Sequence, residues 1–106
     1  MDYFRVEVER RNGVAEVRAV GELDLASKGQ LSRAIDGAVS AHAVVLDLAG
    51  VTYFDARGVR LLRRARDEAF ARGSTFRVGP ASRIVRTVLE IVDELDLLDD
   101  ASQPAN

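Results

Sequence analysis

The short apolar run Ala43-Val44-Val45-Leu46-Asp47-Leu48 is the feature that most constrains the fold of this chain. It consists mainly of branched apolar residues, a composition typical of a central strand that is covered on both faces. Segments with the period of a helix stand before and after it. This order predicts an α/β arrangement in which helices pack on a sheet that contains the run.

Three helices are predicted from apolar residues at three- and four-residue spacing. The first follows Ser27, a candidate N-cap, and the second covers about residues 57–72 with Gly73 closing it. The third is expected to open at Pro80-Ala81-Ser82. The expected inward positions are Leu31, Ala34, Ile35, Ala38 and Val39, then Gly58, Leu61, Leu62, Ala65 and Ala69, and finally Ile84, Val88, Leu89, Val92 and Leu95.

Alternation of apolar with charged residues predicts two strands near the N-terminus, around residues 4–8 and 15–19. Asn12-Gly13 lies between them and is a strong signal for a tight hairpin turn. A further strand is expected at 75–78. Two strands followed by alternating helices and strands require at least two crossover connections on one sheet.

Length and composition favour a single cytoplasmic domain. The 106 residues suffice for one hydrophobic core, and we expect one domain over 1–100 with a disordered tail over 101–106. The chain has no cysteine, which excludes disulfides and thiolate chemistry. No signal peptide or membrane-spanning run is recognisable, so no membrane insertion is expected. The net charge of −2, with few aromatic residues in the arginine-rich part, argues against nucleic-acid binding.

The segment Val51-Thr52-Tyr53-Phe54-Asp55-Ala56-Arg57-Gly58 connects the central strand to the second helix. The unpaired N–H groups and positive dipole of a helix N-terminus stabilise an acidic cap there, or a phosphate on an adjacent hydroxyl. Asp55 can be the cap, which is a simpler hypothesis than partner contact. Ala56 has no hydroxyl. Arg57 is a cation where the dipole disfavours one, so we expect the local field to favour an anionic group of a partner.

Three separated motifs resemble those of the STAS domain family, named for sulfate transporters and anti-sigma factor antagonists. Gly21-Glu22-Leu23-Asp24 resembles the family's turn into the first helix, residues 45–48 with 54–58 resemble its central strand and phosphorylation loop, and Gly79-Pro80 resembles the start of its last helix. The resemblance covers about residues 4–98. It implies a STAS-like α/β fold in which an N-terminal hairpin joins a mixed sheet of about four to five strands, with three to four helices.

The resemblance also implies a regulatory site. In single-domain members, a hydroxyl residue after the loop aspartate is phosphorylated by a kinase that is also an anti-sigma factor, and the added charge weakens binding. That position corresponds to Ala56, so no phospho-acceptor stands there. Thr52 is a candidate substitute, although a turn or strand-end role is the simpler hypothesis. The expected partner-binding residues are Asp24, Asp55, Ala56, Arg57, Gly58, Arg60 and Arg64.

Arg57, Arg60 and Arg64 recur at helical spacing, with Arg63 beside them, and are expected to share one exposed face. This stripe is the candidate surface for an acidic partner, and an ordinary solvated face is the alternative. Gly58 serves either close approach of a partner or packing of the helix against the sheet.

The resemblance therefore implies a non-catalytic anti-sigma factor antagonist that binds a kinase-type, GHKL-like anti-sigma factor through residues 52–64. An accessory subunit of a lipid-transport ATPase complex is the alternative, and nucleotide binding at the helix N-terminus is a third hypothesis. No catalytic constellation, phosphate loop or metal-ligand cluster is recognisable, and no cofactor is expected. A homodimer is compatible with the sequence.

Overall fold

The computed structural model describes residues 3–98 and opens with an antiparallel hairpin. Its strands are β1 (Arg5–Arg11) and β2 (Val14–Glu22). The two residues between them, Asn12 and Gly13, have φ angles of 53° and 80°. A tight two-residue hairpin turn requires such left-handed values, which asparagine and glycine adopt most readily. The predicted hairpin is confirmed.

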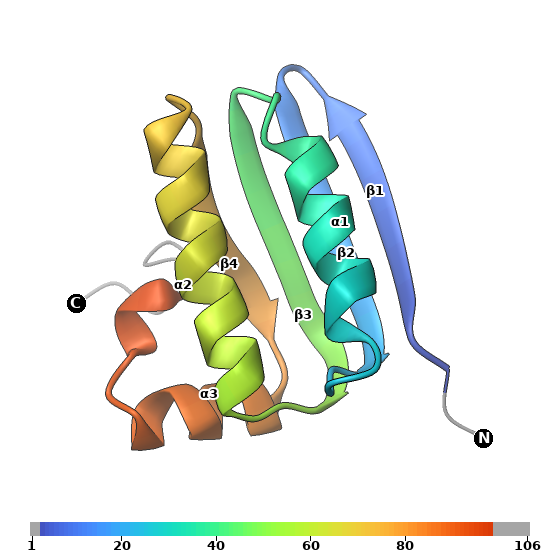
Figure 1. Ribbon diagram of the computed structural model, residues 1–106, viewed down its shortest axis with the longest axis vertical. Helices are drawn as coiled ribbons and strands as arrows, with labels where there is room; N and C mark the ends of the chain where they lie inside the picture. Colours follow the sequence, from blue (N-terminus) through green and yellow to red (C-terminus); the bar gives the residue numbers. More distant parts are fainter. Residues whose placement is uncertain (1–2, 99–106) are drawn as a thin grey trace.

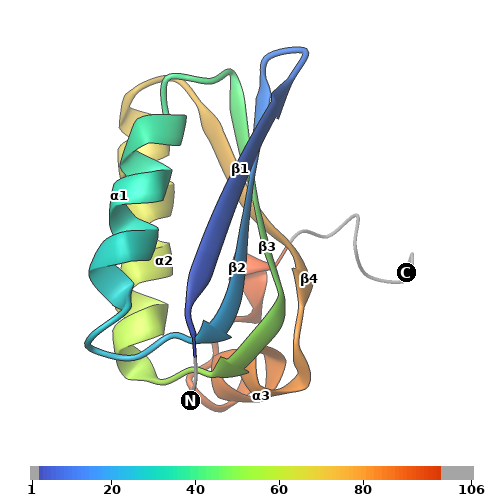
Figure 2. The same cartoon turned by 90° about the vertical axis from the view of Figure 1, so that its right-hand side faces the viewer.

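The hairpin is one side of a four-stranded mixed sheet with the order β1-β2-β3-β4 (Figure 1). β3 (Ala43–Tyr53) runs parallel to β2, and β4 (Thr75–Ala81) runs parallel to β3. The crossover helices α1 (Lys28–Ala38) and α2 (Ala56–Ala71) lie side by side on one face of the sheet (Figures 1 and 2). The expected α/β fold with a mixed sheet is confirmed.

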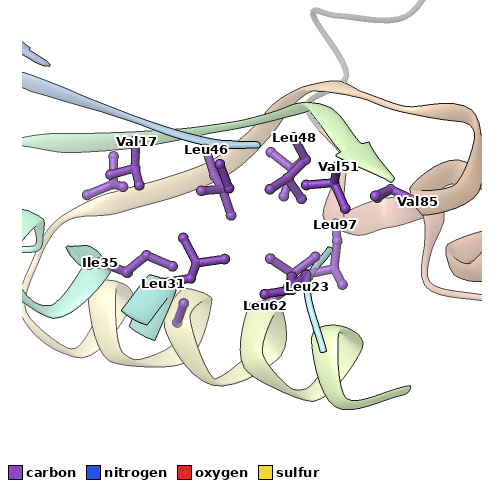
Figure 3. Packing of buried hydrophobic residues seen from close by; sticks show 14 of the residues in the cluster. Val17, Leu23, Leu31, Ile35, Leu46, Leu48, Val51, Leu62, Val85 and Leu97 are labelled. Atoms are coloured by element: carbon purple, nitrogen blue, oxygen red, sulfur yellow. The ribbon is translucent and has the colours of Figure 1, made fainter. Parts of the chain in front are cut away.

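The hydrophobic core lies between this face of the sheet and the two helices (Figure 3). Val17 and Leu46, from β2 and β3, face Leu31 and Ile35 of α1, and Leu62 of α2 closes the same layer. All five are almost fully buried. Each such side chain contributes about 1.5–3 kcal/mol relative to an exposed one, which makes this layer the main source of the fold's stability.

The opposite face of the sheet carries a ladder of charges. Arg18 of β2 is in register with Glu7 of β1 and Asp47 of β3. Its guanidinium lies 3.7 Å from the Glu7 carboxylate and 3.3 Å from that of Asp47. The prediction that the central strand is covered on both faces is therefore wrong, because α1 and α2 lie on the other face only (Figure 2). Val45 on this face is half-buried, with Glu16 and Arg77 as its register partners.

β4 and the last helix differ from the prediction at their junction. Pro80 lies inside β4, and α3 (Arg83–Ile91) begins three residues later with Ser82 at its N-cap position. Proline is tolerated in the strand because the pairing with β3 is irregular after Val78. A missing N–H at such an irregularity costs no ladder hydrogen bond.

The buried side of α3 also differs from the prediction. Val85 and Leu89 are buried, whereas Ile84, Val92 and Leu95 are exposed. The prediction failed at the last two positions because α3 ends before them, so the helical period no longer applies.

After α3 the chain turns back toward the sheet. Asp93 has a φ of 60°, and a 3₁₀ turn, η1 (Leu95–Leu97), follows it. Leu97 and Leu98 are buried in place of the predicted Val92 and Leu95. Leu98 also forms a β-bridge with Val78 on the outer edge of β4. The tail predicted at 101–106 lies outside the described residues.

Candidate functional site

The parallel strands β2, β3 and β4 finish at the same end of the sheet, which brings the turns after β2 and β3 together. Glu22 is the register partner of Tyr53, and the N–H of Leu23 donates to the Tyr53 carbonyl at 3.0 Å. The first residues of α1 and α2 start at this end as well (Figure 1). Asp24 and Asp55, thirty-one positions apart in sequence, therefore belong to one surface.

Asp24 organises the turn that leads into α1. Its carboxylate accepts hydrogen bonds from the N–H groups of Ala26 and Ser27, at 3.0 and 3.1 Å. The Ser27 hydroxyl lies 3.0 Å from the same oxygen and 2.6 Å from the Glu22 carbonyl. The contact with this hydroxyl and the two N–H groups lower the pKa of Asp24. Ser27 does occupy the N-cap position, but its side chain does not cap the helix and serves this turn instead.

Asp55 caps α2, as predicted. Its carboxylate accepts the N–H of Arg57 at 2.9 Å and the hydroxyl of Tyr53 at 3.0 Å. Partial burial opposes ionisation, but these two bonds and the Arg57 charge outweigh it and lower the pKa of Asp55. Conversely, the bond to this carboxylate raises the pKa of Tyr53. The turn is held by an ionised, multiply bonded cap.

Arg57 does not behave as expected. Its guanidinium folds back and lies 2.8 Å from the Asp55 carboxylate. The cation at the helix N-terminus is therefore neutralised by the cap of the same helix. The expectation that Arg57 makes the local field favour an anionic group of a partner is wrong, because that expectation followed from the charge of one residue without its neighbour in space.

Ala56 is the first residue of α2, and its side chain is exposed. A hydroxyl at this position would be accessible to a kinase, and the alanine lacks it. Thr52 is exposed too, but it belongs to strand β3 and not to the turn. The simpler hypothesis for Thr52, a strand-end residue, agrees with the structure.

Gly58 is a packing residue. It is buried in the first turn of α2, where the ring of Phe54 lies against it. A Cβ added at this position would lie 2.7 Å from Cδ1 and 3.0 Å from Cζ of that ring, and closer still to Cε1. The alternative in which Gly58 admits the backbone of a partner has no support from this geometry, because the space beside it is filled by Phe54.

A groove of about 220 Å³ runs between α1 and α2. Its charges divide along its length, because both helices start at the same end of the molecule (Figure 1). The cations belong to the first turns of the two helices or to the middle of α2, and the acids to later turns. The charged lining residues are Lys28, Arg57, Arg60 and Arg64 on the basic side, and Asp36 and Glu68 on the acidic side.

The arginines of α2 fall into two groups. Arg63 lies 3.3 Å from Glu94, and Arg66 lies 3.5 Å from Asp96, so both tie α2 to the segment around η1. Arg60 and Arg64 are exposed and form no ion pair with any residue between positions 3 and 98. Two of the three arginines in the predicted stripe therefore have no ion pair within the described residues, whereas the third, Arg57, is paired with Asp55.

Two exposed apolar residues join this surface. Leu25, in the turn after Asp24, is 62% exposed, and Tyr53 is 44% exposed. Leu25 was missed because an apolar residue two positions after the buried Leu23 resembles another core position. Only the course of the turn shows that it points to solvent.

The described residues meet neither the requirements for a metal centre nor those for a membrane-spanning helix. Between positions 3 and 98, no group of three or more histidine, cysteine, aspartate or glutamate side chains is placed to hold a metal ion. In the same part of the chain, no helix is both long and apolar enough to cross a membrane.

Comparison with known proteins identifies the fold. An anti-sigma factor antagonist from Mycobacterium paratuberculosis superposes with a TM-score of 0.79, at 23% identity over 91% of this chain and 83% of that one. The anti-sigma factor antagonist SpoIIAA in its unphosphorylated form gives 0.73, at 21% identity over 92% and 86%. The Bacillus cell fate determinant SpoIIAA in its phosphorylated form gives 0.69, at 19% identity over 92% and 89%.

At these identities the solved structures establish the fold alone. No protein of curated function matches the chain. A family model described as the STAS domain matches residues 5–102. Since this match spans nearly the whole sequence and the observed topology agrees with it, the chain belongs to the STAS domain family.

Proposed function

We propose that this protein is a non-catalytic anti-sigma factor antagonist that binds a kinase-type, GHKL-like anti-sigma factor through residues 52–64. The observation that carries the proposal is the surface where the Asp24 and Asp55 turns meet the basic end of the α1/α2 groove. Two of the solved structures that resemble this chain are of anti-sigma factor antagonists, which favours this class of partner. A role in controlling a sigma factor also requires the protein to act in the cytoplasm.

The surface combines groups that suit an acidic partner. Arg60 and Arg64 offer guanidinium groups that are not engaged within the described residues, and Arg side chains bind carboxylates in bidentate fashion. Leu25 and Tyr53 add exposed apolar area at the rim of the same surface. Interfaces of this kind derive affinity from a few apolar anchors and specificity from the charges around them.

Asp24, Asp55 and Gly58 contribute by shaping this surface. Asp24 and Asp55 fix the two turns through the hydrogen bonds of their carboxylates, and Gly58 lets α2 approach Phe54. A preorganised loop loses less conformational entropy on binding than a mobile one. The surface is therefore built for one conformation rather than for a change of shape.

Regulation by phosphate at the usual position does not apply to this chain. Ala56 stands at the exposed start of α2, where the family resemblance places a serine or threonine. We propose that binding is constitutive, or that it is controlled through the partner. The protein then acts as an antagonist that its kinase cannot switch off at this residue.

The test uses the kinase-type anti-sigma factor of the same organism with ATP. The wild-type chain should bind it and incorporate no phosphate, whereas Ala56→Ser should incorporate phosphate and then bind at least about tenfold more weakly, since the added charge lies within the interface. Thr52→Ala should leave binding unchanged. Residues 54–58 contain no hydroxyl, so the contradicting result is phosphate on the wild-type chain at Thr52 or Tyr53 that weakens binding.

A second arm tests the surface. Arg60→Glu and Arg64→Glu should each weaken binding about tenfold or more, whereas Arg72→Glu, at the far end of α2, should not. Retention of wild-type affinity by both groove variants would remove this surface from the interface. Co-purification with a transporter ATPase in place of a GHKL-type kinase would replace the proposed partner with the alternative one.

A further inference from the structure

α3 has two apolar sides. Val85 and Leu89 are buried against the rest of the domain, whereas Ile84 and Ile91 are exposed. Val88 lies between these two and is half-buried. Positions 84, 88 and 91 are four and three residues apart and so share one side of the helix. Ile91 is 76% exposed, so this outer stripe is uncovered within the described residues.

The stripe is accessible from outside the molecule. In both views α3 lies at one end of the domain, with no other helix or strand beyond it (Figures 1 and 2). Leu95, in the turn that follows, is also exposed and extends the apolar area. An approaching helix would therefore meet the stripe without displacing any described element.

The charges on α3 are separated by sign along its axis. Arg83 and Arg86 lie in its first turn, Glu90 in its last turn and Asp93 just beyond. None of the four forms an ion pair with another residue between positions 3 and 98. Cations at the N-terminus and anions at the C-terminus of a helix also oppose its dipole. A neighbouring antiparallel helix would place anions beside these cations and cations beside these anions, and so would offset the unfavourable interaction at each end of α3.

We infer that α3 is a homodimerisation surface, on which the α3 of a second copy packs in antiparallel direction. A two-fold axis near Val88 places Ile84 of one copy against Ile91 of the other, and Arg83 beside Glu90 of the other. Arg83 and Glu90 are seven residues apart and so lie on the same flank of the helix, and like flanks meet in an antiparallel pair. The same surface serves both copies, as a two-fold interface requires.

The dimer formed in this way is weak. α3 has nine residues, and at 1.5 Å per residue its contact is only about 13 Å long. Such an interface buries less than the area of about 1,200 Å² that a stable complex needs, which favours a dissociation constant in the range of about 10 µM to 1 mM. The protein therefore dimerises at high local concentration and is monomeric when dilute.

Sedimentation velocity of the full 106-residue chain, over about 5 µM to 1 mM, tests the inference. The wild type should shift from monomer to dimer across this range, and Ile91→Glu should stay monomeric. Phe70→Glu is the matched control, because Phe70 is 83% exposed on α2 near the opposite end of the molecule and should leave the shift unchanged (Figure 1). Circular dichroism verifies that both variants fold.

Charge reversal tests whether the occupant is a second copy of this chain and whether its α3 runs antiparallel. Arg83→Glu and Glu90→Arg should each weaken the dimer about tenfold, because each places like charges together twice in a two-fold interface. The double variant Arg83→Glu/Glu90→Arg should return to within about threefold of the wild type. A monomeric wild type at the highest concentration, an intact Ile91→Glu dimer, or a double variant no stronger than the singles would each overturn the inference.

Discussion

Replacing Gly58 by alanine should destabilise the protein, although alanine is the better helix former. Gly58 is buried in the first turn of α2, and a Cβ at this position would lie 2.7 Å from Cδ1 of the Phe54 ring. Phe54 is only 3% exposed, so the ring cannot move aside into solvent. Relief of the contact must come from displacement of α2 or from repacking of the core beneath it.

The magnitude follows from two opposing contributions. Alanine gains at most about 1 kcal/mol over glycine in a helix. Overpacking of a filled site costs about 1–3 kcal/mol, and a contact with a buried ring belongs in the upper part of that range. The free energy of unfolding should therefore fall by about 1–2 kcal/mol, which lowers the melting temperature by about 4–8 °C per kcal/mol in a domain of this size.

Urea denaturation at neutral pH measures the change, with Gly37→Ala as the matched control. Gly37 is exposed in α1, and a Cβ there meets no atom within 4 Å. The same substitution should stabilise the protein at this site by about 0.5–1 kcal/mol, so the two variants have opposite signs. In the double variant Phe54→Leu/Gly58→Ala, the shorter side chain at position 54 relieves the contact. The two substitutions together should therefore cost about 1 kcal/mol less than the sum of their separate costs.

The reasoning would be refuted if Gly58→Ala were as stable as the wild type or more stable. That result would mean that the propensity gain exceeds the contact cost, and that Gly58 is present for some reason other than packing. Absence of coupling with Phe54→Leu would show that the added methyl group meets something other than the ring.

Two further predictions concern the ionised cap. Because the pKa of Asp55 is lower in the folded than in the unfolded chain, its contribution to stability is complete above about pH 4 and is lost as the pH falls through the folded value. Asp55→Asn should therefore flatten the decline of stability below about pH 4, and an unchanged slope there would argue against the cap. The Asp55 carboxylate raises the pKa of Tyr53, so ultraviolet titration of a Tyr3→Phe chain should place the ionisation of Tyr53 above the ordinary value of about 10. Adding Asp55→Asn to this chain should lower the pKa of Tyr53. Identical titration curves for the two chains would contradict the hydrogen bond.

Features that depend on a few neighbouring residues were predictable. Asn12-Gly13 specifies its turn because both residues adopt positive φ, and Asp55 caps α2 because its side chain reaches the N–H two positions later. The same holds for the helical periods of α1 and α2. For the candidate site, the sequence alone identified Ala56 as the position without a hydroxyl.

Features that depend on which surfaces meet were not predictable. The pattern of α3 allows both an inner side with Val85 and Leu89 and an outer side with Ile84 and Ile91, and only the position of the helix at the end of the sheet selects between them. Likewise, β3 has an apolar pattern on both sides, yet the helices cover only one. The period of a pattern gives the element, whereas the neighbours determine which side is buried.

The sequence by itself determined the elements, their order, the family resemblance and the absence of a hydroxyl at position 56, because propensity, capping and residue identity act locally. The tertiary structure alone decided that Arg57 is neutralised by Asp55 while Arg60 and Arg64 remain unpaired in the described part of the chain, and that Asp24 shares their end of the molecule. The physical reason is that ion pairing and exposure depend on distance in space, and parallel strands bring together turns that are far apart along the chain.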